Sequence, residues 1–384
     1  MTTIIIIGFI QAFFFAMLAL TKRKKEVADY ILAFLFLLLC YQLGVNYMIL
    51  TGNEDTAPHL IGTAGPMSFL YGPLLFFFIK NYISEKHEFK PKYLLHFVPF
   101  LADHIYLFFD FYLQPSQEKI QDFHEIMSGK PDADLAFLLI LRSLSPLIYC
   151  IWSISILKTH RENLKKLYSF TSEKLTLDWF WYLTWSMFIV GISAMILNMV
   201  IVFTDVIDWV KLREMVFVIA TVWVFFLGYY SVKKTPFYRS YHIDGIDTLE
   251  YNEVVKQPEK YEKTRLKEEE IPGLKHKLLD YLQQEKPYLS KNLSIGELAD
   301  GLDIPSYQLS QLINDQLGQS FFEFINSYRV EEVKQRFFEP KYSNLTLLGI
   351  AMECGFNSKA SFNRIFKQLT NQTPTEYIKT KKAA

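Results

Sequence analysis

The sequence predicts an all-α protein in two parts: a polytopic bundle of about seven transmembrane helices, then an all-α domain with two helix-turn-helix motifs. Hydrophobic residues make up 51% and aromatic residues 16% of the 384 residues, more than a soluble protein with an ordinary core contains. The surplus lies in residues 1–232, whereas residues 233–384 are charged like a soluble domain. In this second part, apolar residues recur with a helical period after capping residues.

Long apolar stretches define the expected membrane part. A helix needs about 20 mostly apolar residues to cross a bilayer. Seven stretches meet or approach this length, at roughly 4–20, 28–50, 66–79, 93–113, 135–157, 179–204 and 214–232. The first has no basic residue before it and a basic run, 22–25, after it, which is the reverse of a signal peptide. We therefore expect it to be a membrane span.

The distribution of Lys and Arg predicts the orientation, because these residues concentrate in cytoplasmic loops. The loops after the first, third, fifth and seventh stretches hold 16 of them, and the loops on the other side hold 4. This bias predicts a multi-pass protein of the cytoplasmic (inner) membrane, with its N-terminus outside and its C-terminal domain in the cytoplasm. An odd number of spans agrees with that orientation, and a missing span would break it.

Residues 233–271 are expected to form a linker between residues 1–232 and a C-terminal domain at 272–384. The stretch from about 235 to 270 has no amphipathic period and ends in a dense run of charge. As a flexible coil of about 35 residues it would span only ~30–35 Å on average. The C-terminal domain would therefore stay close to the membrane.

The three cysteines are too far apart to define a site. Cys40, Cys150 and Cys354 form no C-x-x-C pair and no even framework, so we predict neither a disulfide scaffold nor a metal site. Each is expected to be a buried apolar residue. We expect no cofactor.

Ionisable residues inside apolar stretches are costly and usually functional. Asp103, His104 and Asp110 fall in the fourth stretch and Arg142 in the fifth. The predicted orientation allows Arg142 to pair with an aspartate. Such a pair is either an interhelical tether or part of a ligand- or proton-sensing pocket, and Asp103, His104 and Arg142 are the sensor candidates.

The first helix-turn-helix motif begins at Ser294. Ser294 and Glu297 form an S-x-x-E capping box for a short helix. Ala299 is small where a second helix would cross, and Asp303 tolerates the left-handed backbone of a turn. A second helix is expected from Ser306 to about residue 316.

A second motif of the same plan follows. Apolar residues recur over 347–354, Gly355 suits a left-handed turn, and Asn357 or Ser358 caps the next helix. Between the motifs, residues 319–338 are expected to form one helix about 30 Å long. Such a spacer holds two recognition helices near one duplex turn apart, ~34 Å.

Residues 273–379 resemble the DNA-binding domain of AraC-type regulators. The most specific string is IAMECGFNSKASFNRIFKQLTNQTPTEY, which meets the pattern G-F-x-S-x-x-x-F-x-R-x-F-K from Gly355 to Lys367. Asn371 stands where a glycine is usual, and asparagine accepts the left-handed conformation. Lys379 lies near a usual arginine and keeps a positive charge there. FLYGPLLFFFIK, LLHFVPFL and FLGYY also resemble the seven-helix regions fused to AraC-type domains in Bacteroidota regulators.

The resemblance implies that the second helix of each motif reads DNA. In the first motif the outward residues are expected to be Tyr307, Gln308 and Gln311, where glutamine suits adenine. In the second, Asn363 suits adenine and Arg364 suits guanine or phosphate. The full set of expected DNA-binding residues is Tyr307, Gln308, Gln311, Ser358, Lys359, Asn363, Arg364 and Lys367.

Charge divides unevenly between the motifs. Residues 273–339 hold 7 basic and 10 acidic residues, and residues 340–384 hold 7 basic and 2 acidic residues. We expect the second motif to supply most attraction to the DNA backbone, and the first to contribute readout through neutral polar groups.

The function expected from these features is one-component regulation. The membrane part would sense a small molecule or an envelope signal, and the C-terminal part would bind double-stranded promoter DNA, either alone or as a homodimer. The alternative is a membrane receptor or transporter-like protein whose C-terminal domain docks a protein partner. Walker, H-E-x-x-H and G-x-S-x-G motifs are missing from the sequence, so we do not expect an enzyme.

Overall fold

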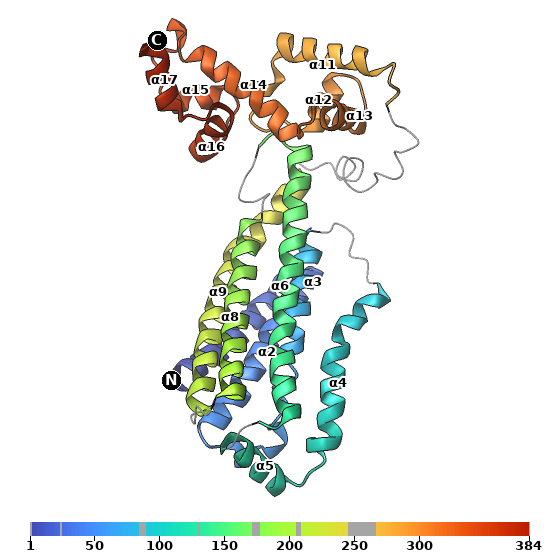
Figure 1. The fold of residues 1–384 in the computed structure, drawn as a ribbon, viewed down its shortest axis with the longest axis vertical. Coiled ribbons are helices and arrows are strands. Elements are labelled where there is room, and N and C mark those ends of the chain that lie inside the picture. The colour runs from blue at the N-terminus through green and yellow to red at the C-terminus, as the bar shows by residue number, and fades with distance from the viewer. Residues whose placement is uncertain are drawn as a thin grey trace. The chain divides into compact units, whose positions relative to one another are not determined.

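The computed structural model describes residues 2–23, 25–83, 90–128, 131–170, 177–204, 209–244 and 266–383, and all regular elements in these ranges are helices (Figure 1). The all-α prediction is therefore confirmed. The chain divides into two compact units: Met1–Lys158 with Leu177–Pro236, and Thr159–Thr176 with Phe237–Ala384.

The first unit is a bundle of helices, most of them long and apolar, and the C-terminal ends of two of these helices group with the second unit. They are α1 (Thr2–Thr21), α2 (Val27–Leu50), α3 (Ser68–Ile83), α4 (Val98–Leu107), α5 (Ser116–Ser128), α6 (Ala133–Leu167), α8 (Asp178–Phe203) and α9 (Trp209–Asp244). Helices α8 and α9 run side by side (Figure 1), where the Trp223 indole donates to Ser186 Oγ at 2.9 Å. A 3₁₀ segment, Pro91–Phe97, precedes α4 and a π turn, Phe108–Tyr112, follows it.

Six segments of the described chain are long and apolar enough to cross a membrane: Thr2–Thr21, Val27–Leu50, Pro91–Tyr112, Ala133–Leu167, Asp178–Phe203 and Glu214–Ser231. The sequence predicted about seven, and the difference is α3. It has 16 residues, about 24 Å of helix, which is less than the ~30 Å hydrocarbon core of a bilayer. Nine of its residues are buried, so burial within the unit accounts for part of its apolar composition.

Three helices differ in extent from the sequence prediction. Helix α5 occupies residues 116–128, between two of the predicted spans, where no helix was predicted. Helix α6 continues ten residues beyond the predicted end at 157, to Leu167. Helix α9 continues to Asp244, so the beginning of the predicted linker is helical rather than coil. The rest of that linker, 245–265, lies outside the described residues, and α11 begins at Ile271.

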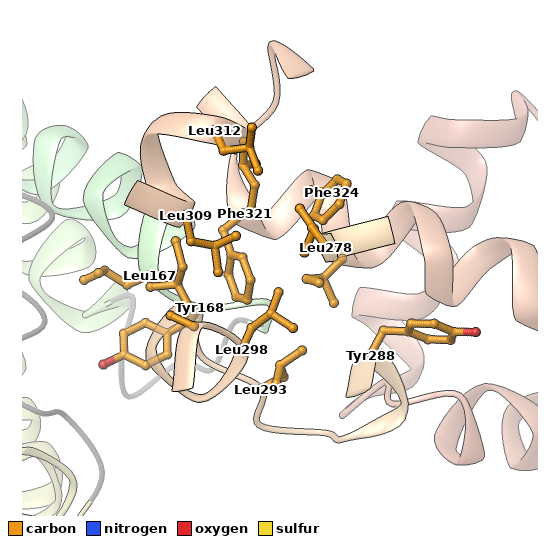
Figure 2. Packing of buried hydrophobic residues seen from close by; sticks show 14 of the residues in the cluster. Leu167, Tyr168, Leu278, Tyr288, Leu293, Leu298, Leu309, Leu312, Phe321 and Phe324 are labelled. Carbon is orange, nitrogen blue, oxygen red and sulfur yellow. The ribbon is translucent and has the colours of Figure 1, made fainter. Parts of the chain in front are cut away.

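The second unit is built from short helices around two apolar cores. They are α11 (Ile271–Glu285), α12 (Ile295–Gly301), α13 (Ser306–Gln311), α14 (Phe321–Arg336), α15 (Leu347–Glu353), α16 (Lys359–Thr370) and α17 (Pro374–Ala383). One core includes Leu298, Leu309 and Phe321 (Figure 2). The other includes Ile350, Phe362 and Phe366.

Helix α14 contributes to both cores. Phe321 and Ile325 are buried in the first core, and Val330 and Val333 in the second. Its start is fixed by a capping box, in which Ser320 Oγ accepts from Glu323 N at 3.2 Å. The helix therefore has 16 residues, about 24 Å, rather than the ~30 Å expected for 319–338.

Candidate DNA-binding and sensor sites

The first helix-turn-helix motif consists of α12 and α13. Ser294 Oγ accepts from Glu297 N at 3.1 Å, and the Glu297 carboxylate accepts from Ser294 N at 2.8 Å, which is the predicted capping box. Ala299 is fully buried where the helices meet. Asp303 has a φ of 53°, the left-handed turn expected from the sequence. After Gln311 the backbone continues as a π turn, Leu312–Gln316.

The second motif consists of α15 and α16. Thr346 caps α15 by accepting from Gly349 N at 3.0 Å, and Ser358 caps α16 by accepting from Ser361 N at 3.1 Å. Of the two caps that the sequence allowed, Ser358 is the one used. Asn371 ends α16 with a φ of 58°, so it takes the left-handed role expected of it.

The turn between α15 and α16 depends on Gly355. Its φ is 91°, a conformation that other residues rarely adopt. A Cβ added there would lie 2.5 Å from the carbonyl oxygen of Tyr288 and 2.8 Å from Arg329 Nε. Both backbone conformation and packing therefore require glycine.

Known proteins resemble this region. Residues 298–380 match the family described as "Helix-turn-helix domain". An uncharacterized HTH-type transcriptional regulator of Staphylococcus aureus (strain COL) is 33% identical over 102 residues, which are 27% of this chain and 13% of that protein. The corresponding regulator of strain N315 has the same identity and coverage. The probable transcriptional regulator LumQ of Photobacterium leiognathi is 29% identical over 111 residues, 29% of this chain and 42% of LumQ.

The C-terminal region is an AraC-type helix-turn-helix domain. The match spans about 13% of the length of the first staphylococcal relatives, so it describes this domain and not the remainder of the chain. No solved structure matches the chain. We call the helices α11–α17 of the second unit the AraC-type domain.

Within the AraC-type domain, α16 presents a continuous polar face. Phe362, Ile365 and Phe366 are buried on its inner side. The predicted DNA-binding residues of this helix and its cap are all exposed: Ser358, Lys359, Asn363, Arg364 and Lys367. The Arg364 guanidinium lies 6.0 Å from the centre of the Phe322 ring, which helps to hold its stem against the domain.

The predicted reading residues of the first motif are less accessible. Tyr307, Gln308 and Gln311 are half-buried. Gln308 Nε2 lies 3.5 Å from the Tyr307 hydroxyl, and Gln311 Oε1 accepts from the backbone N–H of Leu266 at 3.1 Å. The structure therefore places Gln311 against the segment that enters α11, and reading a base through this oxygen requires that bond to open.

Sequence reasoning missed Arg329, which is 1% exposed. Its guanidinium donates to the carbonyl oxygens of Tyr288 at 2.7 Å and Ser290 at 2.6 Å. It also donates to Ser169 O at 2.9 Å and to Ser169 Oγ at 3.0 Å. Burial lowers the pKa of Arg329 to about 10, so it remains charged at neutral pH. Its place on the buried Ile325–Arg329–Val333 face of α14 was a signal in the sequence.

An ion-pair cluster lies on the same helix. The Glu332 carboxylate accepts from Lys286 Nζ at 3.0 Å, from the Tyr288 hydroxyl at 3.1 Å and from Arg336 Nε at 2.9 Å. Burial alone would raise the pKa of Glu332, but the hydrogen bonds and charges of Lys286 and Arg336 more than offset it, so the pKa is lowered. The cluster ties α14 to the segment after α11.

In the first unit the structure brings together two of the three sensor candidates. Arg142 donates from Nε to Asp103 Oδ2 at 2.8 Å and from Nη2 to Asp103 Oδ1 at 2.9 Å. The side chains of Asp103 and Arg142 are 1% and 11% exposed. His104 instead contacts the Tyr112 hydroxyl at 3.1 Å, and Asp110 is exposed. The pair that the orientation allowed is therefore present, with Asp103 as the partner.

A cavity of about 360 Å³ lies beside this pair. Most of its lining is apolar, and its polar lining residues include Gln42, Tyr71, Arg142, Ser143 and Asn198. Asn198 donates to Ser143 Oγ at 2.7 Å, and Tyr71 donates to Gln42. A Cβ at Gly65 would lie 2.7 Å from Arg142 Nη1, so a glycine there lets the guanidinium reach the cavity.

Proposed function

We propose that this protein is a membrane-bound, sequence-specific DNA-binding transcription regulator that senses a signal through its first unit. The observation that carries the proposal is the exposed face of α16, which presents Lys359, Asn363, Arg364 and Lys367 opposite a buried apolar face. This arrangement lies in an AraC-type domain, and relatives of that domain are named as transcriptional regulators. Proposed boundaries are 1–232 for the membrane part, 233–271 for the linker and 272–384 for the DNA-binding part.

The chemistry of the α16 face fits a major groove. Asparagine offers a donor and an acceptor to adenine, and arginine pairs with guanine through two hydrogen bonds. Lys359 and Lys367 suit phosphate contacts, which orient the helix without reading sequence. In the first motif, Tyr307 and Gln308 are the proposed readers, and Gln311 joins them if Leu266 releases it. The excess of basic residues in 340–384 supports DNA backbone attraction mainly through the second motif.

The apolar surface of the first unit supports a bilayer environment. In the segment Pro91–Tyr112 only 6% of the most apolar window is buried. Leu95, Ile105 and Phe109 are 69%, 59% and 74% exposed. Such a surface is unfavourable in water and favourable in lipid. The proposed orientation, with the AraC-type domain in the cytoplasm where DNA is found, follows from the Lys and Arg bias.

The cavity beside Asp103 and Arg142 is the proposed sensor site. Its volume suits a small ligand, and its mostly apolar lining favours a molecule that partitions into lipid. Two of the Arg142 nitrogens are bonded to Asp103, while Nη1 has no hydrogen-bond partner among the described residues. The ligand class that fits is a largely apolar molecule with a hydrogen-bond acceptor, such as a carboxylate or hydroxyl, placed against Nη1.

In vitro selection of DNA tests the proposed function. Full-length protein in membrane vesicles should enrich specific sequences from a random duplex pool. The variant R364A/K367A should enrich none, whereas K275A/K291A, which removes two exposed positive charges outside the recognition helices, should enrich the wild-type sequences. Absence of enrichment by the wild-type protein would overturn the proposal and favour a domain that docks a protein partner.

A further inference from the structure

A short segment distant in sequence completes the core of the AraC-type domain. Leu164, Leu167, Tyr168 and Phe170 are buried in the same apolar cluster as Leu298 and Leu309 (Figure 2). Leu167 is fully buried and Tyr168 is 4% exposed. Residues 159–176 also group with the second unit rather than with the helical bundle before and after them. We call residues 164–170 the docked segment.

Backbone contacts fix the docked segment against the start of α12. Tyr168 forms an antiparallel bridge with Ser294, the residue that caps α12. Ser169 N donates to Leu293 O at 3.2 Å, and Ser169 Oγ donates to the same oxygen at 2.7 Å. The docked segment therefore holds the first helix of the first helix-turn-helix motif at its N-terminus.

Two buried side chains of α14 are oriented toward the docked segment. The Ser169 carbonyl oxygen accepts from Asn326 Nδ2 at 2.8 Å and from Arg329 Nη1 at 2.9 Å. Asn326 and Arg329 are each 1% exposed. Undocking the segment would leave the buried Asn326 and Arg329 donors, one of them charged, without this acceptor, which is far less favourable than losing a surface contact.

The docked segment also contains the last residues of α6, a helix that begins in the first unit. Helix α6 runs without interruption from Ala133 to Leu167. It carries Arg142, which lines the cavity, as well as Leu164 and Leu167, which are buried in the AraC-type domain. No loop interrupts α6 between Arg142 at the cavity and Leu164 in the AraC-type domain.

From these contacts we infer that the docked segment is an obligatory part of the first helix-turn-helix motif and that DNA binding by this motif depends on its docking. The inference rests on the proposed function. A change at Arg142 that moves α6 acts directly on Leu167–Phe170, and through Leu293 and Ser294 on the start of α12. The proposed regulation of the AraC-type domain therefore runs through α6.

Docking is tested first without reference to DNA. Opposite residues of an antiparallel bridge have Cα atoms about 4.5–5.5 Å apart, within the range of a disulfide. Full-length Y168C/S294C in membranes should form an internal cross-link under mild oxidation, and each single variant should not, because Cys40, Cys150 and Cys354 are buried. In the unmodified protein, the Ser169 amide should be protected from hydrogen exchange. No cross-link together with rapid exchange at Ser169 would overturn the inference.

Dependence of DNA binding on docking is tested with a matched pair of full-length variants. L167A/Y168A removes two buried side chains of the docked segment, and E162A/K166A removes two exposed side chains from the same end of α6. The probe is a duplex selected by the wild-type protein. We expect L167A/Y168A to bind it at least tenfold more weakly and to exchange faster at Leu293–Glu297, and E162A/K166A to behave as wild type.

The outcomes separate the two proposals. If L167A/Y168A binds the duplex within twofold of E162A/K166A, the dependence on docking is wrong even where the cross-link forms. If the wild-type protein selects no duplex, the proposed function is wrong, and the cross-link and hydrogen exchange still decide whether the segment docks.

Discussion

In the proposed function, some residues of α16 position the helix on DNA and others read the bases. Ser358 is exposed, but its hydroxyl already accepts from Ser361 N, so its first role is to start the helix. Lys359, Asn363 and Lys367 are four residues apart and share one face, with Arg364 beside them. These positions were predictable from the sequence, because the apolar residues Phe362, Ile365 and Phe366 define the buried face of the helix and the opposite face is therefore exposed to solvent.

Arg364 is the residue of α16 best suited to base recognition. Replacing it by alanine should weaken binding to the selected duplex by ~1–3 kcal/mol and relax the base preference at one position, because a bidentate contact to guanine is lost. The measurement is affinity for the selected duplex and for single-base variants of it. Unchanged affinity and unchanged preference would place Arg364 outside the groove.

Lys367 is expected to act on phosphate alone. K367A should weaken binding to selected and unrelated duplexes equally and lower the slope of log affinity against log salt by about 1. The control is K275A, which removes an exposed charge from α11 and should leave the slope unchanged. A sequence-dependent loss in K367A would contradict a phosphate contact.

Glu332 makes the AraC-type domain sensitive to acid. Its pKa is lowered in the folded protein, so its contribution to stability is present above the unfolded value, near 4.3, and is lost as the pH falls toward the folded value. We expect E332Q to destabilise the domain by about 1–3 kcal/mol at pH 7 and by progressively less below about pH 4. Hydrogen exchange of α14 in the full chain measures this destabilisation. If E332Q destabilised the domain equally at all pH values, the stability contribution assigned to the Glu332 carboxylate would be contradicted.

At the scale of elements, local sequence signals predicted the two helix-turn-helix motifs but not the docked segment that packs against the first of them. Capping residues and left-handed turn residues at Ser294, Asp303 and Gly355 determine where helices begin and end, and each acts only on the helix ends within a few residues of itself. The capping box at Ser320 and Glu323 was also in the sequence, and it explains why α14 begins at Phe321. The docked segment has no local signal, because its partners lie more than 120 residues away.

The turn before α16 provides a matched test of glycine. Gly355 and Gly318 both have positive φ, of 91° and 63°, but only Gly355 has neighbours within the reach of a Cβ. G318A should cost ~1–2 kcal/mol from backbone conformation alone, and G355A should cost more because the Tyr288 carbonyl must move. The measurement is hydrogen exchange of the AraC-type domain in both variants. If G318A and G355A destabilised the domain equally, the residues around Gly355 would be able to move away from the added methyl group without a loss of stability.

For the whole molecule, the prediction of orientation depends on whether α3 crosses the membrane. The sequence could not settle the number of spans, because apolar composition is shared by helices buried in protein and by helices in lipid. If α3 crosses, a periplasmic reporter fused after Gly52 or Ser116 should be active, and one fused after Lys92, Lys165 or Ala384 should be silent. Activity at Ala384 would place the AraC-type domain away from DNA and contradict the proposed function.

The proposed signal transmission would connect the buried pair of the first unit to the AraC-type domain through α6. Breaking a buried pair leaves an uncompensated charge that costs about 3–5 kcal/mol, and Asp103 is almost fully buried. We therefore expect R142A to change the output of a promoter reporter, locked on or off, because a regulator of this kind has two states separated by a few kcal/mol.

Double substitution distinguishes the pair from general damage to the fold. D103A/R142A removes both charges and should partly restore inducibility, whereas D110N, which alters an exposed aspartate of the following π turn, should behave as wild type. The cross-link between Y168C and S294C, added to R142A, reports whether the change reaches the docked segment. If R142A is induced normally at normal protein levels, the uncompensated Asp103 charge has no effect on the equilibrium between the two states of the regulator. The Asp103–Arg142 pair would then be an interhelical tether, and the sensor would lie elsewhere.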